Sequence, residues 1–324
     1  MLIRRRRGWE ISEAQATPEA VMLGRRAALA GAATLAVAAP AQAQWNLFGS
    51  AAPAHPPVAL KPLSAARTEK YAPGRAITDE KQSTTYNNYY EFGLSKSVHD
   101  AAQALPLDPW SVEFAGMVGK PGKIGFEDLQ KKMSLEERVY RHRCVETWAM
   151  TVPWIGFPLK DLLALAEPQA GAKYVVFTTL ADQKSMTGLG QRFYPWPYTE
   201  GVTMAEAANE LAFISVGMYG KSLPPQNGAP LRLTLPWKYG FKSAKSIVKV
   251  TLTDKRPVSF WEALQTSEYG FWANVNPAVP HPRWSQATET LLGSDERVPT
   301  KIWNGYGEFV AGLYTGLETE RLFT

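Results

Sequence analysis

A single cysteine, Cys144, narrows the folds that are open to this chain of 324 residues. One thiol cannot form an internal disulfide framework, a CxxC redox pair or a four-cysteine zinc site. The apolar content of 45% is ordinary for a globular protein, so we expect a folded core rather than a disordered chain. The length allows one large domain or two small ones.

The first 43 residues have the pattern of an export signal. Arg25-Arg26 precede the uncharged stretch 27–39, which is too short and too weakly apolar to span a membrane. The stretch is followed by Ala41-Gln42-Ala43, a small-x-small pattern that a signal peptidase cleaves. The arginine pair predicts a twin-arginine signal, although Ala27-Ala28-Leu29 follows where a bulkier Phe-Leu is usual. We therefore expect residues 1–43 to direct export of the folded protein to the periplasm, a route used mainly when a cofactor is inserted before export.

Charge and composition divide the remaining chain into two parts. The leader accounts for +3 of the formal net charge of +5, so residues 44–324 carry +2. This nearly neutral balance argues against a nucleic-acid groove, which would cluster Lys and Arg. Residues 44–84 are rich in Ala, Pro and Lys and predict an extended N-terminal arm with little core of its own. Residues 85–324 are expected to form one globular domain.

The spacing of apolar residues predicts an α+β fold with a mixed sheet and short helices. On the strand 138–145, Tyr140, His142 and Cys144 would share one face. The run 174–180 is typical of a strand buried on both faces. Further strands are expected at 110–118, 213–218, 231–235 and 248–252, and helices at 159–166 and 204–210.

Cys144 has basic neighbours, since it follows Arg141-His142-Arg143. Nearby positive charge lowers the pKa of a thiol and favours the thiolate, which is the nucleophile and the metal ligand. The alternative is a buried free thiol that packs as a small apolar residue. His142 and Cys144 could hold one edge of a metal, but no third ligand is evident, and a strand histidine is more often a hydrogen-bonded structural residue. HExxH, Walker and GxSxG motifs do not occur in the sequence.

The segment 227–245 contains a second group of polar residues. Its leucines alternate with Arg232 along a predicted strand, so the arginine lies on the opposite face. Gly240 permits a turn in which backbone N–H groups converge, with Lys242 and Lys245 close by. Fixed donors and cations together predict a phosphate cradle, whereas a solvated basic turn is the alternative.

A third cluster, Tyr-Asn-Asn-Tyr-Tyr-Glu-Phe at residues 86–92, is rich in aromatic and amide groups. Such groups suit the polar edge of a heterocycle, and an aromatic seam of the core is the alternative.

These clusters belong to longer segments by which the chain resembles the sulfite-oxidase-fold molybdopterin enzymes. It is most similar to the catalytic subunits of the bacterial periplasmic protein-methionine-sulfoxide reductases. The matching segments, in order along the chain, are YNNYYEFGL (86–94), RCVETWAMTVPWIGFPL (143–159), LPPQNGAPLRL (223–233), PWKYGFKSAKSIV (236–248), ANVNP (273–277) and HPRWSQATE (281–289).

The resemblance implies a molybdenum–molybdopterin cofactor, one per chain, in a catalytic domain over 85–324. It makes Cys144 the catalytic thiolate that ligates molybdenum. Arg232 and Lys245 would hold the cofactor phosphate. The full set of implied cofactor contacts is Asn87, Tyr90, Glu91, Thr179, Asn227, Arg232, Ser243, Ala244 and Lys245.

The resemblance also implies an activity, namely the reduction of methionine sulfoxide in oxidised periplasmic proteins to methionine. Electrons would come from the quinone pool through a membrane-embedded b-type haem subunit, and export would use the twin-arginine translocase. Val145-Glu146-Thr147-Trp148 replaces the arginine-rich run of sulfite-oxidising relatives, and the chain ends at Thr324 without their dimerisation domain. We therefore expect a monomer that does not oxidise sulfite.

Glu146, Trp148 and Tyr219 are expected to line the substrate site. A molybdenum reductase of small S- or N-oxides is one alternative that the sequence leaves open. A metal-free periplasmic binding protein is the other, and in that case the cofactor motifs would be coincidental.

Overall fold

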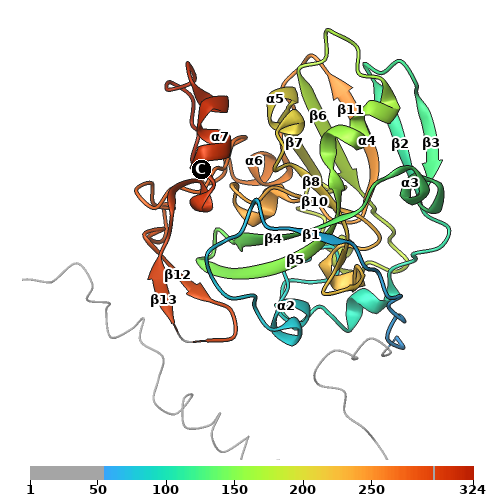
Figure 1. Ribbon diagram of the computed structural model, residues 1–324, viewed down its shortest axis with the longest axis horizontal. Helices are drawn as coiled ribbons and strands as arrows, with labels where there is room; N and C mark the ends of the chain where they lie inside the picture. Colours follow the sequence, from blue (N-terminus) through green and yellow to red (C-terminus); the bar gives the residue numbers. More distant parts are fainter. Residues whose placement is uncertain (1–54, 295) are drawn as a thin grey trace, which may run out of the picture. The chain divides into compact units, whose positions relative to one another are not determined.

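The computed structural model describes residues 55–294 and 296–324 (Figure 1). The predicted signal peptide and residues 44–54 of the predicted arm lie outside the described residues. Within the described part, every helix is too short or too polar to span a bilayer. The rest of the predicted arm contributes β1 (Ala66–Thr68), which pairs in parallel with β4 (Glu136–Arg143), and Tyr71, which is 6% exposed and packs against the core.

The larger sheet is built around β5 (Trp148–Pro158), which pairs with β4 along one edge. Along the other edge it pairs with β12 (Thr288–Leu291) near its start and with β8 (Phe213–Met218) near its end. All residues of β5 before its final proline are buried, because both faces of the strand are covered. The remaining strands of this sheet are β9 (Lys221–Ser222), β10 (Arg232–Thr234) and β13 (Arg297–Pro299).

A second sheet has the order β3-β2-β11-β6-β7. Its middle strand β11 (Ile247–Thr253) runs parallel to β2 (Ser111–Gly116) and antiparallel to β6 (Tyr174–Thr179), so this sheet is mixed as well. Its outer strands are β3 (Gly122–Gly125) and β7 (Thr199–Thr203). The residues of β6 alternate between buried and half-buried, so the prediction that β6 is buried on both faces was wrong. One face of this strand is covered only in part.

The helices are short, as predicted. The helix α4 (Leu159–Ala166) has the predicted bounds, with its leucines at 159, 162 and 163 buried, and it ends where Glu167 takes a left-handed conformation at φ 52°. The other α-helices are α2 (Glu80–Thr85), α3 (Phe126–Lys132), α5 (Met204–Ala208), α6 (Phe260–Leu264) and α7 (Gly307–Val310). Short 3₁₀ turns lie at Ala101–Ala104, Thr187–Gly190, Pro225–Asn227, Gly240–Lys242, Ile302–Gly305 and Ala311–Tyr314.

The α+β class with mixed sheets and short helices is confirmed, and each predicted strand and helix is present within a few residues of its expected bounds. The strand predicted at 138–145 is β4, and it ends at Arg143. Cys144 therefore lies just beyond the strand, in the turn that leads into β5.

Candidate active site

Cys144 lies in a tight turn between the two central strands of the larger sheet. The backbone N–H of Cys144 donates to the carbonyl of Trp148 at 2.9 Å, and the N–H of Thr147 donates back to the Cys144 carbonyl at 3.0 Å. Thr147 closes the turn with a left-handed φ of 70°. Since β4 and β5 are paired along most of their length, the turn holds the thiol at a fixed position. His142, on the preceding strand, faces the same cavity, whereas Tyr140 packs in the core against Phe213.

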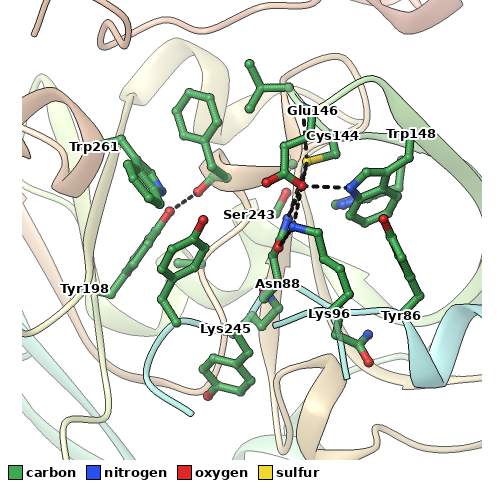
Figure 2. A pocket seen from close by; sticks show the side chains of 18 of the residues that line it. Tyr86, Asn88, Lys96, Cys144, Glu146, Trp148, Tyr198, Ser243, Lys245 and Trp261 are labelled. Carbon is green, nitrogen blue, oxygen red and sulfur yellow. Dashed lines mark hydrogen bonds and ion pairs between the residues drawn. The ribbon is translucent and has the colours of Figure 1, made fainter. Parts of the chain in front are cut away.

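The thiol faces a cavity of about 650 Å³. Figure 2 shows Cys144 and Glu146 between two groups of aromatic rings, Trp148 and Tyr86 on one side and Trp261 and Tyr198 on the other. The structure brings nearly all of the predicted site residues to this cavity, although they come from four separate segments. Those that line it are Asn87, Tyr90, Glu91, Cys144, Asn227, Arg232, Ser243, Ala244 and Lys245. Thr179 does not line it, but its hydroxyl donates to Glu91 at 3.2 Å from behind.

Two cations line the cavity, the buried Arg232 and the half-buried Lys245. Arg232 is 2% exposed and donates only to carbonyl oxygens, among them those of Asn227 and Ser243, each at 3.1 Å. Lys245 donates to the carbonyl of Asn88 at 2.6 Å. Among the described residues, no carboxylate forms an ion pair with either cation. Burial lowers the pKa of Arg232 to about 10. Burial, and next the charge of Arg232, lower the pKa of Lys245 to about 7, and a bound anion would raise it again. Two neighbouring cations that form no ion pair in the described part of the chain form a site for an anion such as a phosphate.

The side-chain oxygens of two neighbouring asparagines accept no hydrogen bond within the described part of the chain. Asn87 and Asn227 both direct their NH₂ groups to the carbonyl of Ser83, at 3.3 and 3.0 Å. Their Oδ1 atoms are buried and have no partner among the described residues. A buried acceptor without a donor costs roughly 1–3 kcal/mol, so a ligand with N–H groups would be favoured here.

Glycines bring the backbone close to this side of the cavity. A side chain at Gly240 would place its Cβ 2.5 Å from Nε2 of His142, so only glycine fits there. Gly228 has a φ of +100°, which is also accessible mainly to glycine. A cation pair, free acceptors and a thiol fit the phosphate, the heterocycle and the metal of a molybdenum–molybdopterin cofactor.

A polar cluster surrounds the thiol. Oε2 of Glu146 accepts from Nδ2 of Asn88 at 3.0 Å and from Nε1 of Trp148 at 3.1 Å, and it forms an ion pair with Nζ of Lys96 at 2.6 Å. It lies 3.7 Å from Sγ of Cys144. Burial raises the pKa of the Glu146 carboxyl, but the hydrogen bonds from Asn88 and Lys96 outweigh it, and the net effect is a lowered pKa. Glu146 is therefore a carboxylate beside the thiol at neutral pH.

The expected effect of the flanking arginines on Cys144 was wrong. Burial, and next the charge of Glu146, raise the pKa of the Cys144 thiol to about 12. Arg143 contributes little because it is paired with Glu289 at 3.0 Å, and the guanidinium of Arg141 donates to the carbonyl of Pro73 at 2.9 Å. A bound metal cation would provide the charge that forms the thiolate, because a coordinating thiol is deprotonated.

Two further expectations need correction. The Lys242 ammonium does not reach the cavity, because it pairs with Glu200 at 2.5 Å and donates to the carbonyl of Gly201. Tyr219 does not line the cavity either, because its hydroxyl donates to the carbonyl of Thr78 at 2.7 Å. Glu146 and Trp148 do line it, as expected.

Several residues that line the cavity were not predicted from the sequence. Asn88 lies inside the recognised cluster 86–92, so its amide could have been singled out. Lys96 and the aromatic residues opposite Trp148 lie in segments without any motif. These aromatic residues are Tyr194, Tyr198, Trp261 and Tyr269. Trp284 also lines the cavity and lies within the matching segment 281–289, although it was not singled out.

Comparison with known proteins gives two results. A family model described as the oxidoreductase molybdopterin binding domain matches residues 99–261, which is half of the chain and includes Cys144 and Arg232. Among solved structures, the chain is similar to the sulfane dehydrogenase SoxCD from Paracoccus pantotrophus, with 18% identity and a TM-score of 0.41. The alignment covers 59% of this chain and 56% of that one, so the chain spans little more than half of that relative's length.

Proposed function

Because this chain belongs to the family of oxidoreductase molybdopterin-binding domains, we propose that it is the molybdenum enzyme that reduces methionine sulfoxide in proteins to methionine. Family membership makes it a molybdenum-dependent oxidoreductase with a molybdopterin cofactor. Arg232 and Lys245 would hold the phosphate of that cofactor, Asn87 and Asn227 would accept hydrogen bonds from its ring, and Cys144 would ligate the metal. The substrate is the part that we propose.

The observation that carries the proposal is the carboxylate of Glu146, 3.7 Å from the sulfur of Cys144. Because Glu146 pairs with Lys96, that ammonium is not free to bind an anionic substrate such as sulfite, whereas a neutral sulfoxide needs no cation. The N–H groups of Asn88 and Trp148 donate to this carboxylate and hold it beside the thiol. Aromatic rings line the same end of the cavity, and sulfur makes favourable contacts with such rings.

The reaction balances as a sulfoxide plus two electrons and two protons giving a thioether and water. The bound cofactor would supply two-electron oxygen-atom transfer. Asn88 and Trp148 hold the Glu146 carboxylate in place, and the aromatic rings of the cavity would orient the substrate side chain beside the thiol. Lys96 is 28% exposed in its side chain and is paired with Glu146, so these two side chains connect the thiol to solvent and provide a route for protons.

We further propose that the enzyme works in the periplasm, after export by the twin-arginine translocase, as the leader pattern of residues 1–43 indicates. The two electrons have to reach the site from outside. A membrane-embedded b-type haem subunit that draws on the quinone pool is the proposed donor, and oxidised periplasmic proteins are the proposed substrates. We propose a monomeric catalytic subunit.

The deciding experiment measures turnover by the molybdenum-loaded protein with a reduced viologen dye as the donor. A peptide that contains methionine sulfoxide should be reduced at a higher kcat/KM than dimethyl sulfoxide or trimethylamine N-oxide, and sulfite should not be oxidised. A strong preference for the small oxides would reject the repair function. Molybdenum below about 0.1 atom per chain after expression with ample molybdate would support the metal-free binding protein instead.

Removing the positive charge of Arg232 or of Lys245 is expected to weaken binding of the cofactor. Arg232→Met and Lys245→Met each remove charged hydrogen bonds worth roughly 1.5–3 kcal/mol, so each variant should retain the cofactor about 10- to 100-fold more weakly. Molybdenum content after dialysis measures this. Lys249→Met is the control, because Lys249 forms an exposed ion pair with Glu113 on β2. Full molybdenum content in both cavity variants would contradict the assignment of these two cations to the phosphate.

A further inference from the structure

One wall of the cavity is a continuous layer of aromatic rings, which we call the aromatic wall and define as Tyr90, Tyr194, Trp261 and Tyr269. The ring of Tyr90 lies 5.0 Å from that of Trp261 and 5.8 Å from that of Tyr194, between centroids. Tyr269 extends the layer at 5.2 Å from Trp261. The wall therefore joins three segments that are distant in the sequence into one apolar face beside the thiol.

The aromatic wall continues out of the cavity to the protein surface. The Phe193 ring lies 4.1 Å from the Tyr194 ring and is 66% exposed, the most exposed of the large apolar residues in the described part of the chain. Tyr194 is held from behind by Phe260, whose ring stacks at 5.7 Å and 22°. Phe193 is therefore presented to solvent on a fixed support. A large apolar side chain exposed at the rim of a functional cavity marks an interaction surface.

Apart from Tyr90, which is one of the implied cofactor contacts, the aromatic wall is separate from the residues that would hold the cofactor. The cations and the unpaired amide oxygens belong to Arg232, Lys245, Asn87 and Asn227, and none of these residues is part of the wall or of the rim at Phe193. No charged or hydrogen-bonding group is offered by Phe193 itself. The side of the cavity with these cations and amide oxygens thus suits the cofactor. The aromatic wall suits an apolar group that enters from solvent.

We propose that Phe193 and the aromatic wall dock an extended polypeptide segment, with its methionine sulfoxide side chain along the wall and a neighbouring apolar residue on Phe193. This proposal rests on the proposed function and adds the surface that distinguishes a protein substrate from a small sulfoxide. A single exposed ring is far smaller than the roughly 800 Å² per partner that a stable protein dimer buries. It is, however, sufficient to hold a side chain next to the reacting residue, where one aromatic contact contributes more than about 1 kcal/mol.

The test compares two substrates that share the reacting group. One is a synthetic peptide with a central methionine sulfoxide between leucines, and the other is N-acetylmethionine sulfoxide amide. With a reduced viologen as donor, Phe193→Ala should lower the ratio of kcat/KM for the peptide to kcat/KM for the amide about tenfold, which is ~1.4 kcal/mol. The loss should lie in KM for the peptide, and Phe193→Trp should restore the ratio.

Ile302→Ala is the matched control, because Ile302 is also an exposed apolar residue, at 47%. Its neighbours in the chain do not line the cavity, whereas Phe193 precedes Tyr194, which does. Its ratio should equal that of the wild type. Equal losses for both substrates in Phe193→Ala, or no change in the ratio, would overturn the docking proposal. A loss seen only with the membrane haem subunit as donor would also overturn it, and would assign this surface to that subunit. If the wild type reduces the amide but not the peptide, the proposed function itself is rejected. If the wild type reduces the peptide and Phe193→Ala leaves the ratio unchanged, only the docking surface is wrong.

Discussion

Replacing Cys144 with serine is expected to abolish turnover of methionine sulfoxide while the fold is retained. A serine hydroxyl has nearly the shape of the thiol but is a far poorer ligand for molybdenum, which accepts soft thiolate sulfur. Substituting a residue that only orients a metal ligand already lowers metal affinity or activity about 10- to 100-fold. Loss of the ligand itself should therefore lower activity by more than ~100-fold. The measurement is kcat/KM with the methionine sulfoxide peptide, together with molybdenum content and circular dichroism.

A change in the same turn provides the control. Thr147→Gly leaves the sulfur in place and relieves the left-handed φ of 70°, so activity and stability should be kept. If both variants lose activity to the same extent, the shape of the turn rather than the sulfur is essential. Wild-type activity in Cys144→Ser would show that the ligand assignment is wrong.

The second large effect is expected on stability, at the buried pair of Lys238 and Glu206. Their Nζ and Oε1 atoms are 2.5 Å apart and both side chains are at most 1% exposed. The Tyr314 hydroxyl also donates to Glu206, at 2.7 Å, and Lys238 donates to Asn274 at 2.8 Å. Glu206→Leu would leave a buried ammonium without its counter-ion, which costs about 3–5 kcal/mol. This is a large part of the roughly 5–15 kcal/mol by which folded proteins are stable.

The loss in Glu206→Leu should depend on pH. Burial lowers the pKa of Lys238 to about 8 even with Glu206 present, against 10.5 for a free lysine, and removing Glu206 lowers it further. Between the folded-state pKa of Lys238 in the variant and 10.5, its value in the unfolded chain, the unfolded state binds more protons than the folded state. The stability of the variant therefore rises as the pH increases toward 10.5. Urea unfolding at neutral and at alkaline pH measures both effects.

Glu113→Gln is the matched control for this pair, because it breaks an exposed ion pair with Lys249 at 2.9 Å. Its cost should stay below about 1 kcal/mol at every pH. An equally small cost for Glu206→Leu would show that the buried pair contributes nothing to the stability of the fold.

The elements that the sequence predicts well are those that depend on local spacing. The leucines of α4 recur at helical intervals, and Glu167 ends the helix where the apolar pattern stops. Both faces of β6 were expected to be buried because its residues are all apolar or uncharged, but composition does not say how much of a sheet its neighbours cover. That depends on packing between elements that are distant in the sequence.

The candidate site also has a part that local sequence predicts and a part that depends on contacts between distant segments. Asn227, Arg232 and Lys245 lie in one continuous segment, so the sequence pattern predicts that they act together. The charge environment of Cys144 was misjudged, because adjacency in the sequence does not imply proximity of charge: Arg143 pairs with Glu289, which is far along the chain. The aromatic wall could not be predicted, since Tyr90, Tyr194 and Trp261 meet only in the folded protein.

The position of Cys144 in the turn between β4 and β5 has a consequence for how the enzyme is assembled. Both strands are hydrogen-bonded inside the larger sheet, so the thiol cannot move aside without breaking the centre of the fold. The segments 86–96 and 191–198 are different, because they close the cavity without belonging to either sheet. The metal ligand is thus held by the sheet itself, whereas these two segments contribute their lining residues from loops and turns.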